Sequence, residues 1–145
     1  MVYSIKKLAY SDVLKMLQDC ENSFNPPLSQ NIPYTVEEYA MKLSNNASFV
    51  VCEEECEIIG FTAFYTNKEG GFFYIPQIWV SDKHQRKGIG AMMLESLIKI
   101  SPDYVESIRL EVRRKNLKAV TFYEKTGFIV LEDNGKKVLL AKGIK

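Results

Sequence analysis

The sequence is poor in the residue types that build metal centres and covalent cross-links. Its 145 residues include three cysteines and one histidine, and no two cysteines form a CxxC pair. An odd number of cysteines with no recognisable signal peptide favours a reduced, cytoplasmic compartment over a disulfide framework. We therefore expect no zinc or other metal site, and we expect His84 to be an exposed loop residue.

The sequence also lacks a charge excess and a long apolar run. Its formal net charge of +1 predicts no strong attraction to nucleic acid or to an acidic membrane. No apolar segment approaches the roughly 20 residues needed to cross a bilayer. A content of 46% hydrophobic and 26% charged residues is typical of a globular protein, and the length predicts a single domain over residues 1–145. Any basic binding site must then be confined to a short segment.

The periodicity of the apolar residues predicts one mixed sheet with helices, which is an α/β (α+β) fold. Strands are expected over residues 2–6, 48–52, 57–65, 72–80, 108–112, 128–131 and 138–141. Helices are expected from a cap at Ser11 or Asp12, from a capping box of Thr35 and Glu38 to residue 46, over 91–100 and over 117–125. The resulting order is β-α-α-β-β-β-α-β-α-β-β.

Proline marks two irregular segments. Residues 22–33 contain Asn25-Pro26-Pro27 and Ile32-Pro33, which predict a long loop, and a long loop in a compact domain is often functional. Pro76 lies in an almost uncharged strand of aromatic and branched residues, a composition typical of a strand buried on both faces. Because proline removes a ladder hydrogen bond, we expect a break in pairing between Pro76 and Trp79.

A glycine-containing segment, Gln85-Arg86-Lys87-Gly88-Ile89-Gly90, lies between that strand and the next expected helix. A helix start presents unpaired N–H groups and the positive end of the helix dipole, and glycine lets a phosphate approach the backbone. The spacing excludes a dinucleotide-binding fingerprint, because Met93 stands where a third glycine or alanine is needed, and it excludes a P-loop. Taken alone, the segment could equally be a surface turn.

A second segment makes the combination specific. It contains Leu110-Glu111-Val112-Arg113, then Asn116, Ala119, Phe122-Tyr123-Glu124-Lys125 and Gly127-Phe128. The two segments together resemble the GCN5-related N-acetyltransferase (GNAT) superfamily, whose Gln/Arg-x-x-Gly-x-Gly/Ala signature matches residues 85–90. The resemblance covers residues 61–128 well, and the element order extends it to the whole chain. Asp82 departs from the proline that many relatives have, which we expect to change the stiffness of the loop.

This resemblance implies the acyl-CoA N-acyltransferase fold, with a splayed central strand near Pro76 to Val80, and it implies acetyl-coenzyme A as the cosubstrate. The backbone of residues 85–90 is implied to hold the pyrophosphate. The full set of implied coenzyme-binding residues is Ile78, Trp79, Val80, Gln85, Arg86, Lys87, Gly88, Ile89, Gly90 and Asn116. Asn116 could instead cap the helix that follows it.

The implied reaction is the transfer of an acetyl group to a primary amine by direct attack. Tyr123 is the candidate general acid, because a phenol with a pKa of about 10 can donate a proton to a departing thiolate. Its structural alternative is an aromatic ring packed on the sheet. Glu111 is the candidate base, because it interrupts an apolar strand and resembles the glutamate of protein alpha-amino acetyltransferases. The alternatives are an ordered water as the base and a salt bridge from Glu111 to Arg109 or Arg113.

The sequence does not determine the identity of the acceptor amine. Phe24 and Tyr34 are candidate substrate residues in and after the expected loop, and Gln77, which cannot titrate, could orient substrate or water. A small molecule such as an amino sugar or an amino acid is slightly preferred over a protein N-terminus, and a homodimer is compatible with the sequence. A non-catalytic acyl-CoA-binding or regulatory module is the alternative class, and a nucleic-acid binder using Arg113-Arg114-Lys115 is the weakest.

Overall fold

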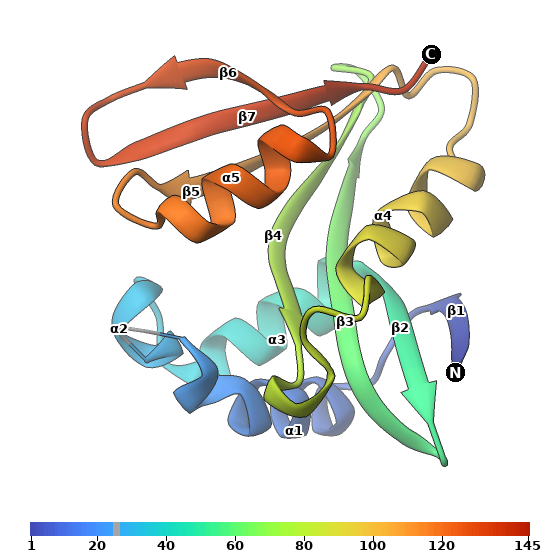
Figure 1. The fold of residues 1–145 in the computed structure, drawn as a ribbon. Helices are drawn as coiled ribbons and strands as arrows, with labels where there is room; N and C mark the ends of the chain where they lie inside the picture. The colour runs from blue at the N-terminus through green and yellow to red at the C-terminus, as the bar shows by residue number, and fades with distance from the viewer. Residues whose placement is uncertain (25–26) are drawn as a thin grey trace. The chain divides into compact units, whose positions relative to one another are not determined.

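The computed structural model describes residues 1–24 and 27–145, so Asn25 and Pro26 lie outside the described residues. Internal contacts divide the chain into unit 1 (Met1–Ala63 and Gln77–Leu97) and unit 2 (Phe64–Pro76 and Ile98–Lys145). The strands form a mixed seven-stranded sheet in the order β1-β2-β3-β4-β5-β7-β6 (Figure 1). The expected α/β class is confirmed, whereas the single domain over residues 1–145 stays a prediction.

Unit 1 contains the N-terminal helices and the glycine segment. Its elements are β1 (Val2–Lys6), α1 (Tyr10–Cys20), a 3-10 turn (Glu21–Ser23), α2 (Leu28–Asn31), α3 (Val36–Asn46), β2 (Ser48–Glu54), the first part of β3 (Glu57–Asn67), the end of β4 (Phe72–Val80), a second 3-10 turn (Asp82–His84) and most of α4 (Ile89–Lys99). Helix α2 lies in the segment expected to be a long loop, so that expectation is partly wrong. In the part of the chain that the structure describes, no helix is long and apolar enough to span a membrane.

The start of α1 also differs from expectation. The helix begins at Tyr10, and its N-cap residue Ala9 makes no side-chain cap bond. The Ala9 carbonyl instead accepts from the backbone N–H groups of Asp12 and Val13, each at 3.1 Å. Ser11 and Asp12 therefore lie in the first turn, where the Asp12 carboxylate still interacts favourably with the helix dipole.

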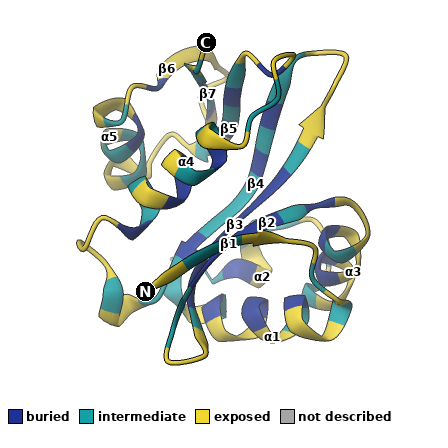
Figure 2. Cartoon of the chain, turned by 90° about the vertical axis from the view of Figure 1, so that its right-hand side faces the viewer, coloured by how far each residue is buried: buried dark blue, intermediate teal, exposed yellow. Residues whose placement is uncertain are grey.

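The core of unit 1 is formed where α1 packs against α3 and both helices bury one side (Figure 2). Their buried residues are Val13, Met16, Leu17 and Cys20 in α1 and Tyr39, Ala40 and Leu43 in α3. Each fully buried large apolar side chain contributes about 1.5–3 kcal/mol to stability. The expected capping box is confirmed, because Thr35 Oγ1 accepts from the Glu38 N–H and the Glu38 carboxylate accepts from the Thr35 N–H, both at 3.0 Å.

Strands β2 and β3 are joined by a two-residue turn at Glu55 and Cys56. Both residues have left-handed backbones, with φ of 52° and 64°. Positive φ at both central residues is what a tight hairpin turn requires to match the twist of its strands. Cys56 is exposed, whereas Cys20 and Cys52 are buried.

Unit 2 contains the C-terminal strands and the last helix. Besides the end of β3 and the start of β4, it contains β5 (Ser107–Arg113), α5 (Leu117–Lys125), β6 (Ile129–Asp133) and β7 (Lys137–Gly143). Strand β5 pairs with β7 in antiparallel fashion over its whole length, and β7 pairs with β6 with a register shift between Val130 and Glu132. Strands β6 and β7 form a hairpin whose turn contains Asn134 and Gly135.

Strand β4 pairs with β5 in parallel only from Phe72 to Ile75. The ladder thus ends immediately before Pro76, so the expected break in pairing is confirmed. Burial on both faces is not confirmed, because Phe73 and Ile75 are buried whereas Phe72 and Tyr74 are only half-buried. The strand therefore has one covered face and one more open face within unit 2.

Candidate functional site

The glycine segment of unit 1 leads directly into α4. Arg86 and Gly88 have left-handed backbones, with φ of 64° and 81°. The Gly88 carbonyl accepts from the Met92 N–H at 3.0 Å, which makes Gly88 the residue that precedes the first turn. Helix α4 starts at Ile89, two residues before the expected position, so Ile89 and Gly90 belong to the helix. The free N–H groups of this first turn are directed toward the space before the helix.

Short polar contacts hold the segment in place. Gln85 Nε2 donates to the Val80 carbonyl at 3.2 Å and to Asp82 Oδ1 at 3.4 Å. Asp82 thus supplies a side-chain acceptor to the segment. His84 was expected to be exposed, but its side chain is 18% exposed and its Nε2 lies 2.9 Å from Glu54 Oε2. That pair connects the turn before the segment to the end of β2.

The end of β4 supplies the three strand residues expected to hold the coenzyme arm. Ile78 and Val80 are half-buried, and the Trp79 ring is buried against Phe61 with ring centroids 6.0 Å apart. A Cβ atom built at Gly60 would lie 3.1 Å from the Trp79 carbonyl oxygen, so glycine permits this close approach of the strands. The Trp79 side chain therefore has a packing role, and any contact it makes with a coenzyme would use its backbone.

Two of the three expected substrate residues, Tyr34 and Gln77, are linked through Tyr39 of α3. Tyr34 stacks on Tyr39 with ring centroids 6.0 Å apart, and the Tyr39 hydroxyl donates to Gln77 Oε1 at 3.3 Å. Lys42 Nζ donates to the Tyr34 hydroxyl at 2.8 Å. Phe24 is half-buried at the end of the first 3-10 turn and takes no part in this chain of contacts. Sequence reasoning did not include Tyr39 among the site residues. A buried tyrosine hydroxyl usually needs a hydrogen-bond partner, and Gln77 is that partner here.

Tyr123 in α5 is 4% exposed, and its ring packs edge to face against Phe122 and Phe128, with centroids 5.1 Å and 5.3 Å away. Burial raises the pKa of its phenol well above the ordinary value of 10. The ring therefore packs against two other aromatic residues, whereas its packing on the sheet stays a prediction. The role of the hydroxyl as a general acid stays a prediction.

The carbonyl of Tyr123 takes part in the end of α5. It accepts from the Phe128 N–H at 2.9 Å, while the Glu124 carbonyl accepts from the Gly127 N–H at 3.1 Å. With Gly127 at a φ of 100°, these bonds form a Schellman motif, and the Tyr123 and Phe128 rings supply its hydrophobic contact. This motif fixes the position of Tyr123 within unit 2.

Glu111 lies on β5 and is exposed. Its Oε1 accepts from the Tyr74 hydroxyl at 3.2 Å. Among the described residues, Glu111 forms no ion pair with Arg109 or Arg113, so the salt-bridge alternative is wrong. Sequence reasoning missed Tyr74, whose partner lies on another strand, although its alternation with buried Phe73 indicates the opposite face of β4.

Asn116 precedes α5, and its Oδ1 accepts from the Ala119 N–H at 3.2 Å. The capping alternative is therefore confirmed, and a contact with the coenzyme arm stays a prediction.

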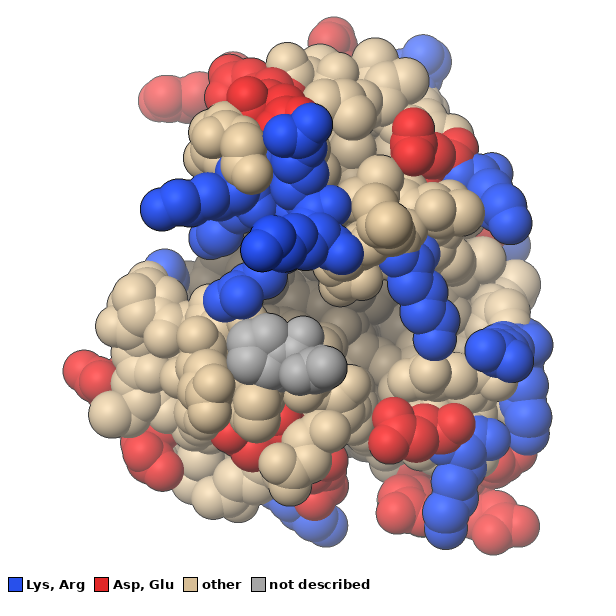
Figure 3. Space-filling model, turned by 60° about the vertical axis from the view of Figure 1, so that its left-hand side comes forward, with Lys and Arg blue, Asp and Glu red and all other residues tan. Residues whose placement is uncertain are grey.

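Positive charge is locally concentrated, because Lys and Arg side chains gather on part of the face drawn in Figure 3 although the net charge is only +1.

Comparison with known structures shows the same fold in proteins that include N-acetyltransferases. The PaiA N-acetyltransferase from Thermoplasma acidophilum, solved in complex with coenzyme A, is 22% identical, with a TM-score of 0.77 and 99% of each chain covered. The ribosomal-protein-S18-alanine N-acetyltransferase from Escherichia coli is 19% identical, with a TM-score of 0.74 over 99% of this chain and 95% of that chain. PH1933 from Pyrococcus horikoshii OT3 is 27% identical, with a TM-score of 0.71 and 98% of each chain covered.

No curated protein matches the sequence. The model of the acetyltransferase (GNAT) family matches residues 11–128, which is most of the chain and includes both sequence motifs. The protein therefore belongs to the GNAT family of acetyltransferases.

Proposed function

We propose that the protein transfers an acetyl group from acetyl-coenzyme A to a primary amine. The observation that carries the proposal is the backbone of residues 86–88, which turns through two left-handed residues into the free N-terminus of α4. Backbone N–H groups at such a helix start bind phosphate groups. The coenzyme A bound to the PaiA relative supports this choice of donor.

The proposed pyrophosphate site has room for its ligand. A Cβ atom at Gly88 would meet nothing within 4 Å, so the space beside the backbone is open and the left-handed φ is what favours glycine there. Arg86 and Lys87 are exposed beside it and add positive charge. We assign the pyrophosphate to the backbone of residues 85–90 and the pantetheine arm to the backbone of Ile78, Trp79 and Val80.

In the proposed reaction the amine nitrogen bonds to the acetyl carbon while the carbon–sulfur bond breaks. Glu111, directly or through an ordered water, takes the proton that the amine loses, and Tyr123 donates a proton to the departing sulfur. The raised pKa of Tyr123 keeps its hydroxyl protonated at neutral pH, as a donor must be. It also makes the phenol a weaker acid than the sequence argument assumed, because that argument used the pKa of an exposed phenol.

A thiol-release assay tests the proposal. Acetyl-coenzyme A is supplied with panels of amino sugars, amino acids, peptides and aminoglycoside antibiotics, and we expect free thiol to appear with at least one panel and to be unaffected by EDTA. Calorimetry on the same protein measures coenzyme binding. Tight binding of acetyl-coenzyme A without turnover on any panel would support the non-catalytic module instead.

A further inference from the structure

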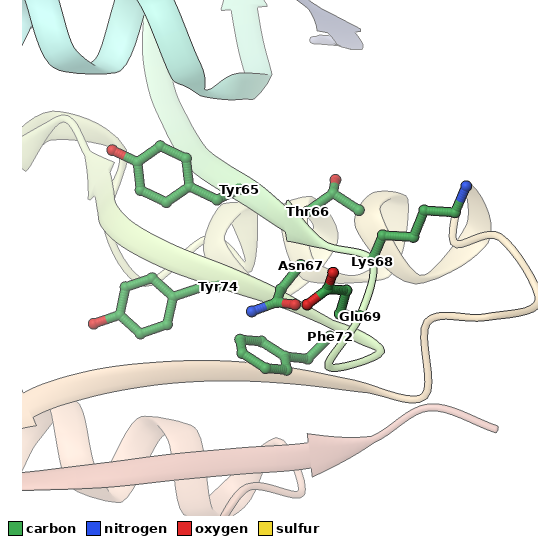
Figure 4. A pocket seen from close by; sticks show the side chains of 7 residues that line it. All are labelled: Tyr65, Thr66, Asn67, Lys68, Glu69, Phe72 and Tyr74. Atoms are coloured by element: carbon green, nitrogen blue, oxygen red, sulfur yellow. The ribbon is translucent and has the colours of Figure 1, made fainter.

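Unit 2 carries an open pocket of about 560 Å³ on the end of β3, the β3–β4 turn and the start of β4. Its lining includes Tyr65, Asn67, Lys68, Glu69, Phe72 and Tyr74. Figure 4 shows the rings of Tyr65 and Tyr74 extending toward the same side, while Lys68 points away from them. The pocket thus has aromatic walls on the more open face of the sheet.

Strand β5 brings two opposite charges to the edge of these aromatic walls. Arg109 is the register partner of Tyr74, and its guanidinium carbon lies 4.3 Å from the centroid of the Phe72 ring. Glu111, two residues further on, accepts from the Tyr74 hydroxyl. Because alternate residues of a strand face the same side, both charges belong to one face, and their Cα atoms are roughly 7 Å apart along the strand.

Arg109 has no anionic partner within residues 1–24 and 27–145. No carboxylate lies within ion-pair distance of it, and its Nε is buried without a hydrogen-bond acceptor. A guanidinium stacked on an aromatic ring keeps its planar edge free for a bidentate contact with a carboxylate. Because Arg109 as a whole is only half-buried and forms no ion pair among the described residues, its guanidinium favours an anionic group from a ligand.

Glu111 is complementary to the other end of such a ligand. Burial and, to a smaller extent, the charge of Glu111 together raise the pKa of Tyr74 to about 12, so the hydroxyl remains a donor. A carboxylate has about four lone-pair sites, and Tyr74 uses one of those of Glu111. The Arg109 guanidinium stacks on the Phe72 ring, and the Glu111 carboxylate accepts from the Tyr74 hydroxyl. Among the described residues, these two charged side chains form no ion pair with each other.

We propose that the acceptor is an amino acid, with its carboxylate bound by Arg109, its amine directed to Glu111, and its side chain placed against Tyr65, Phe72 and Tyr74. This inference rests on the proposed acetyl transfer and chooses among its open acceptors. A simple amine or an amino sugar offers no anion to Arg109. A protein N-terminus offers a neutral peptide carbonyl at the corresponding atom.

The test uses three acceptors that differ only at the carboxylate: phenylalanine, phenylalaninamide and phenylethylamine. We expect kcat/KM for phenylalanine to exceed that of the other two by roughly 10- to 100-fold, the range for a charge-assisted hydrogen-bonded pair. Arg109→Met should remove this preference by lowering kcat/KM for phenylalanine much more than kcat/KM for phenylethylamine, while the affinity for acetyl-coenzyme A is unchanged. Arg109→Lys, which keeps the cation, should restore part of it, and Lys137→Met on the adjacent strand should have no effect.

Equal kcat/KM for the three acceptors in the unmodified protein would overturn the inference and leave the acetyltransferase proposal standing. An Arg109→Met variant that loses activity equally with all three would also overturn it. Calorimetric titration of phenylalanine, with and without coenzyme A, separates the two proposals further. Binding that depends on Arg109 without any acetyl transfer would retain the amino acid site and reject the transferase, whereas absence of binding would reject the site.

Discussion

At the residue scale, Tyr123 uses different atoms for packing and for its proposed chemistry. Its ring and carbonyl stabilise the end of α5, so removal of the hydroxyl alone leaves both contacts in place. We predict that Tyr123→Phe lowers kcat by roughly 10²- to 10⁴-fold, the usual contribution of a general acid, with little change in melting temperature. Thiol release measures the rate, and Tyr104→Phe, at a tyrosine that is 43% exposed, is the control. Normal turnover in Tyr123→Phe would exclude it as the acid.

At Gly88, the effect of an added charge on coenzyme binding can be measured separately from the effect of a changed backbone conformation. Asn and Asp both tolerate a left-handed φ better than other residues, and neither meets a steric obstacle at this position. We predict that Gly88→Asp weakens acetyl-coenzyme A binding roughly tenfold more than Gly88→Asn, because only Asp adds a negative charge beside the pyrophosphate. Calorimetry at low and high salt measures the difference, which should shrink as salt screens the charge. Equal affinities for the two variants at low salt would place the phosphates elsewhere.

At the element scale, the end of α5 depends on one glycine. Gly127 has a φ of 100°, and a Cβ atom there would lie 3.3 Å from the Lys142 side chain. We predict that Gly127→Ala destabilises the protein by about 1 kcal/mol and also lowers kcat, because the same bonds position Tyr123. Urea unfolding measures the stability. Gly143→Ala, where the backbone is not left-handed and the added atom meets nothing, is the matched control and should be close to neutral.

The start of α3 should make stability depend on acid pH. Hydrogen bonds from Thr35 hold the pKa of the Glu38 carboxyl below its ordinary value of 4.5. A lowered folded-state pKa means that the stabilisation is fully present above that ordinary value and is lost as the pH falls through the lowered one. We predict that Glu38→Gln, which keeps the capping box, removes this part of the pH dependence. Melting curves between pH 3 and pH 7 check it, and an unchanged acid slope would contradict it.

At the scale of the whole molecule, the proposed donor should stabilise the folded chain by mass action. A ligand that binds only the folded state at 100 times its dissociation constant adds about 2.7 kcal/mol, which corresponds to a rise in melting temperature of roughly 5–10 °C for a chain of this size. We predict such a rise with acetyl-coenzyme A and a smaller one in Gly88→Asp. A melting temperature that does not respond to millimolar acetyl-coenzyme A would argue against the donor.

Local signals in the sequence predicted most of the fold. Thr35 with Glu38, and Gly127 after α5, mark helix ends through contacts within a few residues, so one sequence suffices to find them. The first residue of α1 was not predicted correctly, because no side chain caps this helix and the backbone carbonyl of Ala9 accepts its first hydrogen bonds. The partners of Tyr39 and Tyr74 lie 38 and 37 residues away, and contacts of that separation follow from strand pairing and packing rather than from local pattern.

The turn between β2 and β3 has a practical consequence. Cys56 presents the chain's single accessible thiol at the tip of a hairpin, while Cys20 and Cys52 are buried and burial raises the pKa of Cys20 to about 12. A thiol-directed fluorophore would therefore attach at one defined point without any engineering of the sequence. The unmodified protein is thus ready for site-specific labelling at the tip of this hairpin.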